Sequence, residues 1–116
     1  MSDRPAELDE LTADLVSIET ENPPGNERPC AEYIHEWFTE RNIEADLVHE
    51  PYEDRPQVAA TVGDGDPTLV LNGHIDVVPA GDREGWSRDP YGGEIEGSTL
   101  YGRGSSDMKT GVAVAM

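Results

Sequence analysis

An unbroken apolar run that ends at a polar corner is the feature that most constrains the fold of this chain. Residues 68–72 (Thr-Leu-Val-Leu-Asn) show no alternation of apolar and polar side chains, and Gly73, His74 and Asp76 follow at once. A short strand without alternation is typical of a sheet that is covered on both faces, as in α/β proteins. The pattern therefore predicts a buried strand over 68–72, with His74 and Asp76 at its end, where sites in open sheets usually form.

Helical periodicity dominates residues 6–42. Residues 6–20 predict a helix with one buried face, because apolar side chains recur at helical spacing at Leu8, Leu11, Leu15 and Ile18. The stiff turn Asn22-Pro23-Pro24-Gly25-Asn26 should end it. We expect Asn26 to cap a second helix that tolerates Pro29 in its first turn and ends at residues 41–42.

Shorter patterns fill the rest of the chain. Residues 43–47 and 57–62 predict two strands, 79–93 predict a long surface loop, and 94–96 with 99–101 predict a hairpin around Gly97-Ser98. Residues 108–116 predict the opening of a helix that has no closing signal at Met116. The order of elements is α/β in character, and we expect the front part of a larger, incomplete domain.

The charge of the chain excludes several classes of partner. It has 25 Asp and Glu against 8 Lys and Arg, a net charge of −17. A field this negative repels nucleic-acid phosphates and anionic membrane surfaces, so we expect no nucleic-acid or membrane partner. The acids are spread along the chain, which favours a solvated acidic surface. Our hypothesis is adaptation to high intracellular salt, where screening relieves the self-repulsion.

The single cysteine and the N-terminus bear on the cellular compartment. Cys30 has no partner for an internal disulfide, and its apolar neighbours favour a small core residue over a nucleophile. The N-terminus lacks the basic and apolar regions of a secretory signal, and no apolar stretch approaches the ~20 residues of a membrane helix. These features predict a cytoplasmic protein.

His74 and Asp76 have a spacing that suits a metal site. Side chains two residues apart on an extended segment point to the same side, while Ile75 between them points to the core. A carboxylate can hold the proton on one ring nitrogen of a histidine, which leaves the other nitrogen free to bind a metal ion. The alternative is that Asp76 only caps a turn and His74 only hydrogen-bonds to it.

Asp107 is a third candidate. It follows the flexible stretch Gly102-Arg103-Gly104-Ser105-Ser106 and precedes the last predicted helix, so it could serve only as a helix N-cap. A carboxylate brought beside His74 could instead bridge two metal ions ~3.5–4 Å apart.

Three linked motifs resemble those of a known enzyme family. They are LNGHIDVVPAG (71–81), WSRDPYGG (86–93) and GSTLYGRGSSDMKTG (97–111). Their order and spacing resemble the co-catalytic zinc amidohydrolases and peptidases, which include acetylornithine deacetylase, succinyl-diaminopimelate desuccinylase, carboxypeptidase G and aminoacylase. ENPPGNE (21–27) is similar to the early loop of the family, so the resemblance extends from about Leu8 to Met116.

The resemblance implies roles for individual residues. His74 would bind one metal ion, Asp76 would be the catalytic-site aspartate that orients His74, and Asp107 would bridge two zinc ions, for which cobalt can substitute. The family often has a cis peptide bond after that bridging aspartate, here Asp107-Met108. We expect Lys109 to be a surface or helix-start lysine, and we expect structural roles in the rim of the site for Trp86, Pro90 and Tyr91.

The resemblance also implies an architecture and a reaction. The fold would be the N-terminal portion of a zinc-peptidase-like catalytic domain, with a mixed, largely parallel sheet flanked by helices. Residues 1–116 would form this segment, and the rest of the domain, with its general-base glutamate and a lid or dimerisation domain, would lie outside it. The implied activity is hydrolysis of amide bonds in N-acyl amino acids or small peptides, in amino-acid metabolism, by a parent that can be a homodimer.

We expect the isolated chain to be inactive, because zinc hydrolytic sites normally use three protein ligands. The alternative is a non-catalytic remnant, or a fragment that needs a partner chain.

Overall fold

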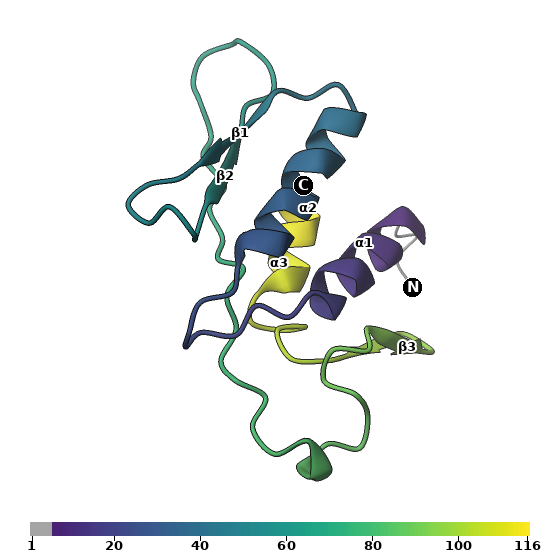
Figure 1. The fold of residues 1–116 in the computed structure, drawn as a ribbon. Coiled ribbons are helices and arrows are strands. Elements are labelled where there is room, and N and C mark those ends of the chain that lie inside the picture. Colours follow the sequence, from purple (N-terminus) through teal and green to yellow (C-terminus); the bar gives the residue numbers. More distant parts are fainter. Residues whose placement is uncertain (1–5) are drawn as a thin grey trace.

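Three helices form the centre of the structure, and two small sheets lie at its periphery (Figure 1). The computed structural model describes residues 6–116. The helices are α1 (Ala6–Ser17), α2 (Arg28–Glu40) and α3 (Lys109–Ala115). The strands are β1 (Ala45–Val48), β2 (Gln57–Ala60), β3 (Glu94–Glu96) and β4 (Thr99–Tyr101), and a short 3₁₀ helix, η1, spans Arg83–Gly85. All three predicted helices are present.

The main core joins the two ends of the chain. Its buried side chains come from all three helices and are Leu11, Leu15, Cys30, Ile34 and Ala113. Two of the four apolar residues predicted to line α1, Leu11 and Leu15, are buried, and the other two pack against the core at its edge. The interpretation of Cys30 as a core residue is confirmed, since it is fully buried. Apolar burial across α1 and α3 thus places residues 107–116 beside the N-terminal third of the chain.

The start of α2 differs from the prediction. Its N-cap is Glu27, not Asn26, and no side chain caps the helix there. The backbone N–H of Asn26 instead donates to the carbonyl of Glu21 at 3.2 Å, within the proline-containing turn. The carboxylate of Glu27 accepts two hydrogen bonds from Arg55, at 2.8 and 2.7 Å. Helix α2 therefore begins one residue later than predicted, and Pro29 lies in its first turn as expected.

Both sheets in the described residues are antiparallel pairs, β1 with β2 and β3 with β4. The β3–β4 hairpin matches the predicted one residue for residue. β1 lies within one or two residues of its prediction, and β2 stops two residues early. The largely parallel sheet is not present among these elements: the one parallel pairing in residues 6–116 is the isolated bridge between Glu21 and Val77.

The predicted strand over 68–72 is wrong for this structure. No strand forms there, and Leu69, Val70 and Leu71 are 82%, 77% and 65% exposed. The physical reason is that a strand needs a hydrogen-bonded neighbour, and no strand within residues 6–116 lies against this run. These three residues, hereafter the apolar run, therefore lie open to solvent.

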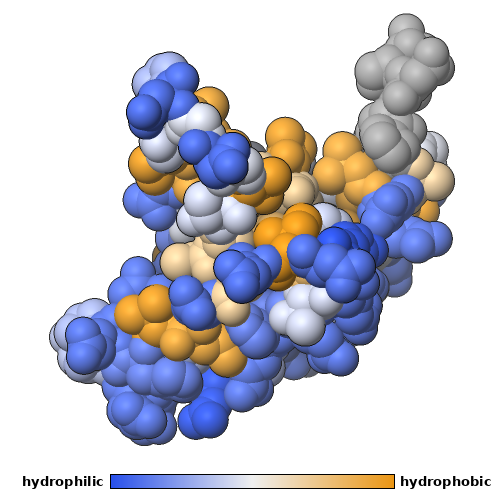
Figure 2. Space-filling view, turned by 90° about the horizontal axis from the view of Figure 1, so that it is seen from above, coloured by the Kyte–Doolittle hydropathy of each residue, from blue (hydrophilic) through white to orange (hydrophobic). Residues whose placement is uncertain are grey.

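The surface is mostly hydrophilic but carries separate hydrophobic patches, as the view from above shows (Figure 2). Several large apolar side chains outside the apolar run are also exposed, among them Val62 and Val78. None of the described helices is long and apolar enough to cross a membrane.

Candidate metal centre

Residues 20–22 and 75–77 lie side by side and form the floor of the candidate site. The backbone N–H of Val77 donates to the carbonyl of Thr20 at 2.9 Å, and the backbone N–H of Asn22 donates to the carbonyl of Val77 at 2.8 Å. The buried hydroxyl of Thr20 donates to the carbonyl of Ile75 at 2.6 Å. These bonds fix the extended backbone on which His74 and Asp76 stand.

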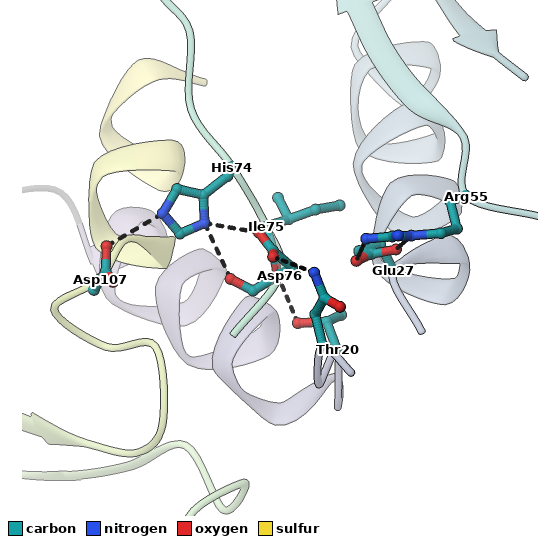
Figure 3. A network of polar contacts seen from close by, with 8 residues as sticks. Thr20, Glu27, Arg55, His74, Ile75, Asp76 and Asp107 are labelled. Atoms are coloured by element: carbon teal, nitrogen blue, oxygen red, sulfur yellow. Dashed lines mark hydrogen bonds and ion pairs between the residues drawn. The ribbon is translucent and has the colours of Figure 1, made fainter. Parts of the chain in front are cut away.

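His74 lies between two carboxylates (Figure 3). Its Nδ1 is 3.0 Å from Oδ1 of Asp76 and 3.0 Å from the backbone carbonyl oxygen of Asp76. Ile75 packs against the main core, so the expected division of sides along this segment is observed. Asp76 therefore contacts Nδ1 of His74, and Nε2 points outward.

Asp107 meets that outward nitrogen. Its Oδ1 is 3.2 Å from Nε2 of His74, across 33 residues of sequence. Asp107 is not the N-cap of α3, because Met108 holds that position and α3 begins at Lys109. The Asp107-Met108 peptide bond is cis, as the resemblance implies. The loop before α3 thus carries the carboxylate of Asp107 to His74, while the Asp107 side chain itself stays 88% exposed.

The charges around His74 and Asp76 stabilise their ionised forms. Burial alone would lower the pKa of His74, but the Asp76 carbonyl and the carboxylates of Asp107 and Asp76 outweigh burial and raise it. The pKa of Asp76 is lowered, first by the hydrogen bond from Asn22 and then by the positive charge of His74, against the opposing effect of burial. Asp76 is therefore ionised at neutral pH and can hold the Nδ1 proton of His74.

The donor set fits part of a zinc site. An imidazole nitrogen and a carboxylate oxygen are ligands that zinc accepts, and Nε2 of His74 and Oδ1 of Asp107 face each other with the orienting carboxylate behind the ring. Within residues 6–116, no group of three or more His, Cys, Asp or Glu side chains is arranged to hold a metal ion. The described chain thus brings together two donors and one orienting group.

Lys109 starts helix α3, which is one of its two expected positions, but it is not on the surface. It is fully buried, and its Nζ donates to the carbonyl of Ile18 at 2.7 Å. Burial lowers the pKa of Lys109, because removal from water disfavours the charged form. Its backbone N–H donates to the carbonyl of Gly104 at 2.9 Å. Lys109, two residues after Asp107, therefore joins the loop before α3 to the residue that follows α1.

The loop over 79–93 packs around Glu21. The carboxylate of Glu21 accepts hydrogen bonds from the hydroxyl of Tyr91 at 2.6 Å and from the backbone N–H of Ala80 at 3.1 Å. The indole of Trp86 donates to the carbonyl of Ala80 at 3.0 Å. Tyr91 and Trp86 thus hold this loop in place, which agrees with the structural roles expected of them.

Asn22 is the contact that our reading of the sequence missed. Its Nδ2 donates to Oδ2 of Asp76 at 3.0 Å, although 54 residues separate the two. The available signal was its place in ENPPGNE, the stretch similar to the early loop of the family. The sequence predicts a turn and a family-like loop here but not this contact, because a contact over this sequence distance has no local pattern.

Comparison with known proteins agrees with the resemblance. Residues 70–116 match the family described as Peptidase family M20/M25/M40. A probable succinyl-diaminopimelate desuccinylase of Staphylococcus aureus is 37% identical over 103 residues, which are 89% of this chain and 25% of that protein. A protein of the same description from Staphylococcus epidermidis is 36% identical over 88% of this chain and 24% of its own length.

A third relative matches a shorter segment more closely. The succinyl-diaminopimelate desuccinylase of Rhodopseudomonas palustris is 49% identical over 63 residues, 54% of this chain and 16% of that protein. The chain spans about a quarter of the length of the staphylococcal relatives that it matches.

Proposed function

The chain belongs to peptidase family M20/M25/M40, which its residues 70–116 match, and we propose that it is a metal-binding segment of an amidohydrolase. The proposed reaction is hydrolysis of the amide bond in an N-acyl amino acid or a small peptide, in amino-acid metabolism. The names of the relatives, desuccinylases of an acylated diamino acid, support this class of substrate. The proposed compartment is the cytoplasm, and the parent protein can be a homodimer.

One observation carries the proposal: the two ring nitrogens of His74 face different carboxylates, Asp76 on Nδ1 and Asp107 on Nε2. In the proposed site, Nε2 of His74 would hold zinc, while Asp76 retains the proton on Nδ1 and fixes the plane of the ring. Asp107 would be a shared carboxylate ligand for a pair of zinc ions, or of cobalt ions in their place. Bound zinc supplies the Lewis acidity that polarises an amide carbonyl.

The proposed domain is larger than the described fold. The apolar run is exposed and ends three residues before His74. In a protein of the relatives' length, the remainder of the chain would supply neighbouring strands. We propose that the apolar run pairs with them and becomes a buried strand of a mixed, largely parallel sheet. Residues 1–116 would then be the N-terminal segment of that catalytic domain.

A second candidate is a non-catalytic fragment that needs a partner chain. Two observations favour it: the site has only two donors within residues 6–116, and the apolar side chains of the apolar run are exposed. Since zinc hydrolytic sites normally have three protein ligands, we propose that the 116-residue chain alone does not hydrolyse amides. Measurable hydrolysis of an N-succinyl amino acid by the purified chain would contradict this.

Calorimetric titration with Zn²⁺ tests the metal site. We expect binding heat for the unaltered chain that disappears in His74→Ala and in Asp107→Asn. His49→Ala is the matched control, because the one hydrogen bond of the His49 ring within residues 6–116 is to the backbone carbonyl of Glu53, which is not a residue of the site. Equal binding in all four proteins, or none in any, would refute the proposed metal centre.

A further inference from the structure

Asn22 reaches the candidate metal centre from a third part of the chain. Its backbone is held in register by the bond from its N–H to the carbonyl of Val77, beside the parallel bridge between Glu21 and Val77. This pairing places the Asn22 side chain next to Asp76, with Nδ2 of Asn22 3.0 Å from Oδ2 of Asp76. The carboxylate oxygen of Asp76 can only accept a hydrogen bond, so the amide group of Asn22 must present its NH₂ to it.

The two oxygens of the Asp76 carboxylate have different partners. Oδ2 accepts from Nδ2 of Asn22 at 3.0 Å, and Oδ1 lies 3.0 Å from Nδ1 of His74. A carboxylate turns easily about its last side-chain bond, because that torsion is broad and roughly two-fold. With a donor on each oxygen, the plane of the Asp76 carboxylate is fixed, and so is the direction in which it holds the imidazole.

We infer that Asn22 is a positioning residue of the metal centre: through Asp76 it selects the His74 tautomer that presents a free Nε2 to the metal ion. This inference rests on the proposed function only in naming the metal. The contacts from Asn22 through Asp76 to Nδ1 of His74 do not depend on which ion binds. The His74 ring also contacts the Asp76 carbonyl oxygen through Nδ1 and Asp107 through Nε2, and the variants separate the contribution of Asn22 from these contacts.

The surroundings of Asn22 argue against a chance surface contact. Each of three consecutive residues reaches the segment after His74: Thr20 bonds to Ile75, Glu21 to Ala80 and Asn22 to Asp76. The far end of the turn is anchored as well, since Glu27 forms a two-bond ion pair with Arg55. Asn22 is thus held from both sides.

An amide suits this position better than an acid would. Asn22 gives Asp76 a donor without adding charge, whereas a carboxylate at position 22 would meet the ionised Asp76 with like charge and no donor. A reciprocal exchange can restore the pairing, because an asparagine at position 76 still offers an acceptor oxygen to His74 and an NH₂ to an aspartate at position 22.

The decisive experiment reads the His74 tautomer directly by ¹H–¹⁵N NMR of the imidazole ring at one alkaline pH, without metal. The variants are Asn22→Leu, Asn22→Asp, and the exchanged pair Asn22→Asp with Asp76→Asn. Asn26→Ala is the matched control, because Asn26 lies in the same turn and, within residues 6–116, its hydrogen bond is made by its backbone and not by its side chain. A Zn²⁺ titration of each protein is the second readout.

Relative to the unaltered chain, we expect the fraction of the Nδ1–H tautomer to be unchanged in Asn26→Ala, to fall in Asn22→Leu and Asn22→Asp, and to recover in the exchanged pair. Zn²⁺ affinity should fall about 10-fold in the single variants, at the low end of the range for residues behind a metal ligand. A tautomer ratio in folded Asn22→Leu equal to that of Asn26→Ala would overturn the inference.

Two further outcomes of this experiment also decide between the proposals. If Asn22→Leu does not fold, the exchanged pair decides: recovery of the ratio relative to Asn22→Asp supports the inference, and no recovery overturns it. If the tautomer responds as expected but the unaltered chain binds no Zn²⁺, the proposed metal function fails while the positioning role of Asn22 stands.

Discussion

Replacing Tyr91 by Phe tests how strongly the loop over 79–93 is tied to the floor of the site. Tyr91 is 7% exposed, and its hydroxyl donates to the carboxylate of Glu21 at 2.6 Å. Hydrogen bonds to charged groups contribute about 1.5–3 kcal/mol. Since Glu21 keeps its bond from the Ala80 N–H, we expect the loss in Tyr91→Phe to lie near the lower end, about 1.5–2 kcal/mol.

Tyr33→Phe is the matched control for this prediction. The Tyr33 hydroxyl donates to Asp14 at 2.7 Å, with the same donor and acceptor chemistry but an exposed carboxylate. Removal of an exposed interaction should change the free energy of unfolding by no more than about 0.5 kcal/mol. At about 4 °C per kcal/mol for a chain of this size, the melting temperature should fall by about 6–8 °C in Tyr91→Phe and by about 2 °C or less in Tyr33→Phe.

The pH dependence gives an independent check. The pKa of Glu21 is lowered below its ordinary 4.5, first by the hydrogen bond from Tyr91 and then by that from Ala80. A lowered acid pKa stabilises the folded state fully above the unfolded pKa, and this stabilisation is lost as the pH falls through the folded pKa. The difference in the free energy of unfolding between the unaltered chain and Tyr91→Phe should be largest at pH 7 and should shrink below about pH 4. Equal melting temperatures for Tyr91→Phe and Tyr33→Phe would refute the reasoning. So would a stability difference between Tyr91→Phe and the unaltered chain that persists unchanged in acid.

Three further predictions concern the core and the surface. Leu15→Ala should lower the free energy of unfolding by about 3–5 kcal/mol in a denaturant titration, because Leu15 is fully buried, whereas Val114→Ala at a 65% exposed position should cost less than about 0.5 kcal/mol. Burial raises the pKa of the Cys30 thiol to about 11, so alkylation of the folded chain at pH 8 should be far slower than in denaturant, and equal rates would contradict the buried thiol. Since the net charge is −17, the melting temperature should rise with KCl concentration if the acidic surface is an adaptation to salt, and a flat or falling series would reject that hypothesis.

Local elements were predictable because local interactions decide them. The β3–β4 hairpin follows from a two-residue turn at Gly97-Ser98 between short alternating strands, and α1 follows from helical spacing of leucines. The apolar run shows the limit of this reasoning: its composition suits a buried strand, but burial requires neighbouring strands that residues 6–116 do not supply. Lys109 shows the reverse case: its side chain is buried, and its Nζ donates a hydrogen bond to the carbonyl of Ile18, just after α1.

For the candidate site, the sequence by itself determined the residue types and their order: His74 and Asp76 two residues apart on an extended segment, and Asp107 after a flexible loop. The family assignment was also within its reach, since several motifs occur in register. Only the tertiary structure decided which groups meet. Packing of α3 against α1 brings Asp107 to within 3.2 Å of His74. The backbone pairing of residues 20–22 with 75–77 brings Asn22 to Asp76. The physical reason is that these contacts span 33 and 54 residues, and no local preference of the backbone encodes a distance between segments so far apart.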